Sequence, residues 1–247
     1  MDQYHQKKQL ERLLIDYFKE SYPEFPKGKL TESESPDFVL NSNSRQSIGI
    51  ELTRLYPGSQ KTIPDVQQKQ VEIREMLIIY IHDQFVELCN LKCFVKIQFA
   101  DIAIKQEQIF SLSVRLTRLI IRTVEKMSFG KIDRIILSKE LPVGIKSILV
   151  LTHPGLTYSV FERSHNLGIP TKLLDDIQYS IAKKDEKLKL YQKKQLNKYW
   201  LLITTDRLCQ EKSVNISNLI LGSTFNSAMN KVFILELFTG KVTVLIL

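Results

Sequence analysis

Two carboxylates, Asp37 and Glu51, are the residues whose type and spacing best suit chemistry in this chain. Asp37 follows Pro36 at the start of an apolar segment, and Glu51 comes fourteen residues later, between Ile50 and Leu52. A carboxylate held among apolar neighbours is costly unless a counter-charge compensates it. Hard oxygen ligands of this kind suit Mg²⁺ or Mn²⁺. The sequence therefore predicts that Asp37 and Glu51 share a divalent metal ion.

The segments that carry these carboxylates are typical of two β-strands, 29–40 and 47–55, joined by the polar turn Asn-Ser-Asn-Ser-Arg-Gln. Successive side chains of a strand point to opposite faces, so Gly49, Glu51 and Thr53 are expected to share one face. Gly49 has no side chain, and we expect it to leave room for a ligand beside Glu51.

Helices and strands alternate along the rest of the chain. Apolar residues at helical spacing predict helices, and short apolar runs bounded by turn residues predict strands. The expected helices cover 6–22, 65–88, 106–127 and 174–198. The further expected strands cover 91–100, 132–137, 146–152 and 199–205, followed by a terminal hairpin over 231–247. This mixture predicts an α/β fold in a single domain over 1–247, with a loop-rich insertion near 153–172.

The carboxylate pair and its setting resemble the PD-(D/E)XK superfamily of restriction-endonuclease-like nucleases. That family carries Pro-Asp at one strand, then Asp or Glu, any residue and Lys on the next, and a preceding helix often adds a Glu. Pro36-Asp37 and Glu51-Leu52-Thr53 match this order, and Glu11 is the candidate for the additional acid. The resemblance implies a central mixed β-sheet flanked by helices and a nuclease that uses Mg²⁺ or Mn²⁺ to hydrolyse nucleic acid, with DNA as the first candidate substrate.

The family lysine is replaced by Thr53, which cannot supply a cation to stabilise charge that develops on the phosphate. The neighbouring Arg54 is expected to point to the opposite face. Lys69 on the following helix is the first alternative source, and Lys184 or Lys187 on the lysine-rich helix is another. Thr53 itself could orient the attacking water. The predicted catalytic set is Asp37, Glu51, Thr53, Lys69 and Glu11.

The chain carries 35 Lys and Arg against 27 Asp and Glu, a net charge of +8, which favours a polyanionic partner. Seven lysines but only two acids lie between residues 183 and 198, so this segment holds more than half of the excess. Such a patch could bind the phosphate backbone, although a solvated helix face would look the same. The predicted nucleic-acid-binding residues are Lys183, Lys184, Lys187, Tyr191 and Lys194.

Other classes find less support in the sequence. Three cysteines do not suggest a disulfide framework, and four histidines without a spacing of four give no zinc signature. The polar amino terminus is not typical of a secretory signal and no stretch suits a membrane span, so we expect a cytoplasmic protein without a membrane partner.

Three interpretations other than an active nuclease remain open. A catalytically inactive nuclease-fold protein could bind nucleic acid or a protein partner, and the family resemblance also admits a homodimer. The lysine-rich helix could instead dock an acidic partner. In the purely structural interpretation, Asp37 caps a turn and Glu51 pairs with Arg54 or Lys61.

Overall fold

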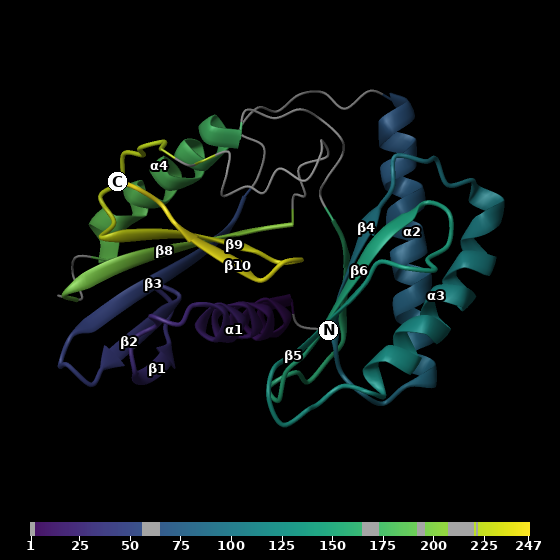
Figure 1. Cartoon of the computed structure of the whole chain (residues 1–247), viewed down its shortest axis with the longest axis horizontal. Helices are drawn as coiled ribbons and strands as arrows, with labels where there is room; N and C mark the ends of the chain where they lie inside the picture. Colours follow the sequence, from purple (N-terminus) through teal and green to yellow (C-terminus); the bar gives the residue numbers. More distant parts are fainter. Residues whose placement is uncertain (1–2, 56–64, 165–172, 192–195, 207–219, 221) are drawn as a thin grey trace. The chain divides into compact units, whose positions relative to one another are not determined.

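The computed structural model describes residues 3–55, 65–164, 173–191, 196–206, 220 and 222–247 (Figure 1). By its internal contacts the chain groups into two compact units, each built from two stretches of sequence. The first unit contains Met1–Asp16 and Lys61–Gly168, and the second contains Tyr17–Gln60 and Ile169–Leu247. The sequence predicted one domain over 1–247, whereas contacts gather around two separate sheets.

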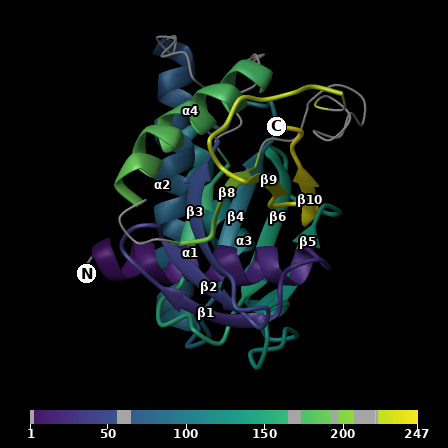
Figure 2. The same cartoon turned by 90° about the vertical axis from the view of Figure 1, so that its left-hand side faces the viewer.

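A six-stranded mixed sheet forms the centre of the second unit, with strand order β1-β2-β3-β8-β9-β10 (Figures 1 and 2). Strands β1, β2 and β3 are antiparallel neighbours, β3, β8 and β9 are parallel, and β10 returns antiparallel to β9. Helix α1 (Gln3–Ser21) belongs to both units, because its residues up to Asp16 group with the first unit and those from Tyr17 with the second. The other elements of the second unit are β1 (Gly28–Glu32), β2 (Phe38–Ser42), β3 (Ser47–Arg54), α4 (Leu173–Tyr191), β8 (Lys198–Thr205), β9 (Lys231–Glu236) and β10 (Lys241–Val244).

Helix α4 covers one face of this sheet, where apolar side chains of the helix pack on those of β8 and β9. The core of this layer includes Ile177, Ile181, Leu188, Leu201, Ile203, Val232 and Ile234. Aromatic rings fill the opposite face, because alternate residues of each strand point there. Phe18, at the end of α1, lies 5.0 Å from Phe233, and Trp200 lies 5.1 Å from the same ring, measured between ring centroids.

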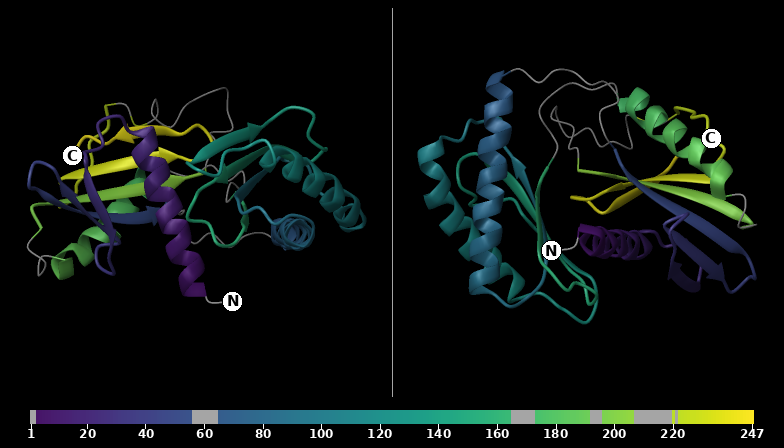
Figure 3. Two further views of the ribbon diagram at one scale, coloured as in Figure 1. Left: turned by 90° about the horizontal axis from the view of Figure 1, so that it is seen from below. Right: turned by 180° about the vertical axis from the view of Figure 1, so that it is seen from behind.

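A four-stranded sheet forms the first unit, in the order β5-β6-β4-β7, and α2 and α3 lie side by side against it (Figure 3). Leu77, Ile81 and Phe85 of α2 and Leu116 and Ile120 of α3 are buried in its core. The elements are α2 (Asp65–Leu88), β4 (Phe94–Phe99), the 3₁₀ helix η1 (Gln106–Gln108), α3 (Ile109–Val124), β5 (Asp133–Leu137), β6 (Ile145–Thr152) and β7 (Val160–Arg163).

The mixed sheets flanked by helices confirm the predicted α/β class. Two element predictions were wrong in detail. Segment 29–40 forms two strands, because Ser33–Pro36 makes a turn that pairs β1 with β2. The helix predicted over 174–198 ends at Tyr191, and Lys198 already belongs to β8. The segment near 153–172, predicted to be a loop-rich insertion, includes β7, which pairs with β4, and its residues 165–172 lie outside the described part of the chain. Among the described residues, no helix is long and apolar enough to cross a membrane.

Candidate functional site

The hairpin of β2 and β3 brings Asp37 next to the segment that carries Glu51. The register pairs Phe38 with Ile50, and Asp37 directly precedes Phe38, so Asp37 lies at the end of the paired part of β2. The Asp37 carboxylate is also fixed, because its Oδ2 accepts a hydrogen bond of 2.7 Å from the main-chain N–H of Leu52. The hairpin therefore holds both predicted metal ligands at neighbouring positions.

Gly49 allows the segment before Asp37 to lie directly on β3. A Cβ atom at Gly49 would lie 2.7 Å from Cγ of Pro36, 2.9 Å from a methyl carbon of Leu196 and 3.1 Å from the ring of Tyr199. The prediction that Gly49 leaves room for a ligand was therefore wrong, because these side chains fill the space. The missing side chain instead permits Pro36 to pack closely and so helps to position Asp37.

Lys184 of α4 places its ammonium group beside Glu51. It lies between the buried residues Ile181 and Leu188 on the face of α4 that packs on the sheet. Its Nζ donates a hydrogen bond of 2.7 Å to Oε1 of Glu51 and another of 3.1 Å to the main-chain carbonyl of Leu52.

Burial strengthens the effect of this ion pair on the stability of the fold. Glu51 is 5% exposed, and the side chain of Lys184 is 15% exposed. Water screens such a pair weakly, and a buried carboxylate without a counter-charge is strongly unfavourable. The parallel pairing of Glu51 with Leu201 places Glu51 on the face covered by α4. The structure thus brings together Asp37, Glu51 and Lys184.

Thr53 shares the face of Glu51, but its hydroxyl engages the local main chain. Its Oγ1 lies 3.4 Å from the carbonyl oxygen of Arg54, at the long limit of a hydrogen bond. Glu51 makes its ion pair with Lys184 and none with Arg54. Lys61, the other partner considered for Glu51, lies outside the described residues.

Two further residues of the predicted catalytic set belong to the first unit. Glu11 lies on α1 and forms ion pairs of 3.4 Å with both Lys7 and Lys8. Lys69 is exposed near the start of α2. The structure therefore gives Glu11 local partners on its own helix and leaves Lys69 in solvent.

The lysine-rich helix presents part of the predicted nucleic-acid-binding set to solvent. Lys183 and Lys187 are exposed, whereas Lys184 between them turns inward to Glu51. Tyr191 is the last residue of α4, and its side chain, like the whole of Lys194, lies outside the described part of the chain.

The donor atoms at the site suit a hard cation. Asp37 and Glu51 supply carboxylate oxygens, and Leu52, which the sequence did not single out, supplies a main-chain carbonyl. The Lys184 ammonium already contacts the Glu51 carboxylate and this carbonyl, so it satisfies the same oxygens that a divalent ion would use. Over the residues that the structure describes, no three His, Cys, Asp or Glu side chains gather closely enough to hold a metal ion. Asp37 and Glu51 are therefore the two acidic side chains that this site could give to a metal.

Comparison with known proteins adds nothing to the description of this site. Among family models, curated proteins and solved structures, none matches this chain. What is known of the site therefore comes from the chain itself: a carboxylate pair fixed by a β-hairpin and a lysine delivered by the helix that packs on it.

Proposed function

We propose that this protein is a restriction-endonuclease-like nuclease that uses Mg²⁺ or Mn²⁺ to hydrolyse phosphodiester bonds of nucleic acid, with DNA as the first candidate. One observation carries the proposal: Nζ of Lys184 lies 2.7 Å from Glu51, and Asp37 accepts a hydrogen bond from the next residue of β3, Leu52. The resemblance requires two carboxylates and a cation, and Thr53 left the cation missing. A lysine from α4 fills the same chemical role from a different position in the sequence.

In this proposal Asp37 and Glu51 would hold the metal, which when bound lowers the pKa of a water molecule and polarises the phosphate. Water attacks phosphorus and gives up a proton to solvent, the bond to the leaving oxygen breaks, and that oxygen takes up a proton from solvent. Lys184 stabilises the negative charge that grows on the phosphate oxygens. The exposed Lys183 and Lys187 would bind neighbouring phosphates of the strand.

A second candidate is a nuclease-fold protein that binds nucleic acid or a protein partner without cleaving. The observation that favours it is the same ion pair considered as a closed unit, because Lys184 neutralises the buried Glu51 without any metal ion. A site of this kind keeps its carboxylates for stability and has no obligatory cofactor.

Cleavage assays on supercoiled plasmid and single-stranded DNA, with Mg²⁺, Mn²⁺ or a chelator, test the first proposal. Asp37→Asn and Glu51→Gln should abolish cleavage, and Lys184→Ala should slow it by about 100-fold, the usual loss for one stabilising contact. Lys29→Ala is the matched control, because Lys29 is exposed on β1 of the same unit and should leave the rate unchanged.

Calorimetric titration with Mn²⁺ separates the two candidates. Metal-dependent cleavage that Asp37→Asn removes, together with Mn²⁺ binding, supports the nuclease. Cleavage that survives both carboxylate substitutions refutes it. Nucleic-acid binding without cleavage, weakened by removal of Lys183 and Lys187, supports the second candidate instead.

A further inference from the structure

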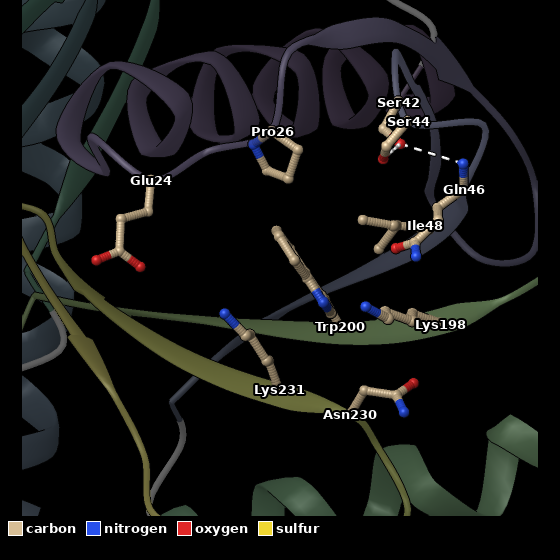
Figure 4. Close-up of a pocket in the computed structure, with 10 residues that line it drawn as sticks. All are labelled: Glu24, Pro26, Ser42, Ser44, Gln46, Ile48, Lys198, Trp200, Asn230 and Lys231. Atoms are coloured by element: carbon tan, nitrogen blue, oxygen red, sulfur yellow. Dashed lines mark hydrogen bonds between the residues drawn. The ribbon is translucent and has the colours of Figure 1, made fainter.

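A pocket lies on the sheet of the second unit, on the face that the aromatic rings occupy (Figure 4). Its volume is about 410 Å³, which lies within the range of sites for small ligands. Ile48, Lys198, Trp200 and Lys231 line it from three neighbouring strands. The candidate nuclease site lies on the other face, because Glu51 and its neighbour in β3, Ile50, point in opposite directions. The two sites are therefore separate.

Two lysines converge on this pocket from strands that are adjacent in space. Lys198 pairs with Ile48 across β8 and β3, and Lys231 pairs with Trp200 across β9 and β8. Figure 4 shows Trp200 between the two lysines. The Nζ of Lys231 lies 5.6 Å from the centroid of the Trp200 ring. Among the described residues no carboxylate forms an ion pair with either lysine, so both ammonium charges remain for a ligand.

One other group at the pocket also offers donors. Asn230 accepts a hydrogen bond of 2.7 Å from the N–H of Tyr199 through Oδ1, which leaves its side-chain NH₂ to donate elsewhere. Trp200 is 4% exposed, and its indole N–H has no hydrogen-bond partner among the described residues. The nitrogen itself is buried, so the Trp200 ring forms part of the pocket wall and its N–H is not a donor to a ligand in the pocket.

The pocket has fewer hydrogen-bond acceptors with a negative charge than donors with a positive charge. Glu24 is its one carboxylate, and the Oε2 of Glu24 already accepts a hydrogen bond of 2.9 Å from the hydroxyl of Tyr22. Two lysines against one glutamate leave a net charge of +1 on the lining. The rings of Phe25 and Phe233 pack on Trp200, at centroid distances of 6.2 and 5.1 Å, so the wall of the pocket is held rigidly.

We propose that this pocket binds the phosphate group of a phosphate monoester. Two ammonium groups that have no carboxylate partner among the described residues, together with an amide NH₂, are donors that suit a phosphate with several acceptor oxygens. The volume admits the phosphate together with an attached sugar or nucleoside. A small phosphorylated metabolite and the 5′-phosphorylated end of a nucleic-acid strand share this chemistry, and the inference holds independently of the proposed nuclease activity.

The fluorescence of Trp200 provides the test, because it is the single tryptophan of the chain and lines the pocket. The full chain is titrated with inorganic phosphate, ribose 5-phosphate, adenosine 5′-monophosphate and adenosine at constant ionic strength. We expect a saturable change with the three phosphates and none with adenosine. Tighter binding of a 5′-phosphorylated oligonucleotide than of adenosine 5′-monophosphate would identify the strand end as the source, and the reverse order would identify a metabolite.

Charge variants establish where the phosphate binds. Lys198→Gln and Lys231→Gln should each weaken binding by about tenfold or more, since each removes a charged donor. Glu24→Gln should tighten binding by removing the opposing charge. Lys241→Gln, an exposed lysine on β10, is the matched control and should leave the affinity unchanged. Calorimetry replaces fluorescence for Lys231→Gln, because that lysine lies over the indole ring. The absence of saturable phosphate binding, or wild-type affinity in both lysine variants, would overturn the proposal.

Discussion

The ion pair between Glu51 and Lys184 makes a sharp prediction about the stability of the second unit. Lys184→Met keeps a long side chain between Ile181 and Leu188 but removes the ammonium. Glu51 then stays 5% exposed with no counter-charge. Removal of one partner of a buried pair costs about 3–5 kcal/mol. Because the side chain of Lys184 is 15% exposed, we expect a loss near the lower end of that range.

A double-mutant cycle isolates the pair itself. Glu51→Gln alone leaves Lys184 with only the carbonyl of Leu52, so it should also destabilise the unit. The double variant removes both charges and should cost less than the sum of the single losses, with a coupling energy of about 2 kcal/mol. Urea unfolding followed by Trp200 fluorescence measures each value, since Trp200 lies on β8 beside β3.

Added Mg²⁺ links this measurement to the candidate metal site. In Lys184→Met the Glu51 carboxylate loses its ammonium neighbour, so a divalent ion held by Asp37 and Glu51 should recover part of the lost stability. A ligand at 100 times its dissociation constant contributes about 2.7 kcal/mol. The recovery should disappear when Asp37→Asn is added to Lys184→Met.

Two outcomes would refute the reasoning. One is Lys184→Met with a free energy of unfolding within about 0.5 kcal/mol of the wild type, which is the usual effect of a surface substitution. The other is strict additivity of the single losses in the double variant. Lys183→Met is the matched control, because the neighbouring Lys183 is exposed and should change stability little.

Three further predictions concern other parts of the chain. Burial raises the pKa of Asp16, but hydrogen bonds from His153 and a neighbouring arginine outweigh it and hold that pKa below its ordinary value of 3.8. The stability that ionised Asp16 contributes is therefore fully present above pH 3.8 and is lost as the pH falls through its lowered pKa in the folded protein. The loss of unfolding free energy caused by Asp16→Asn should therefore shrink in urea titrations at decreasing pH. Gly49→Ala should cost about 1–3 kcal/mol because its methyl group would displace Pro36, and an unchanged urea midpoint would contradict this. Burial raises the pKa of Cys93 to about 12, so mass spectrometry should find this thiol unmodified by iodoacetamide in the native protein at about pH 8 and modified in urea.

Local pattern was sufficient for much of the fold. The helix predicted over 65–88 has the bounds of α2, and the apolar run 199–205 lies within β8. Short-range periodicity decides such elements, because it sets which side chains can be buried together. The prediction of one strand over 29–40 was wrong because the turn at Ser33–Pro36 reverses the chain within this segment. The antiparallel hydrogen bonds between β1 and β2 stabilise that reversal.

The sequence by itself determined the carboxylate pair, because a β-hairpin is local and its pairing brings Asp37 next to the segment of β3 that carries Glu51. Only the tertiary structure decided which lysine contacts Glu51. Lys184 is 133 residues from Glu51 along the chain, and they meet because apolar neighbours dock α4 on the sheet. The two lysines of the phosphate pocket likewise meet only through the parallel pairing of β8 with β9. Spacing in sequence carries no signal for such contacts, since they depend on how faces of separate elements pack.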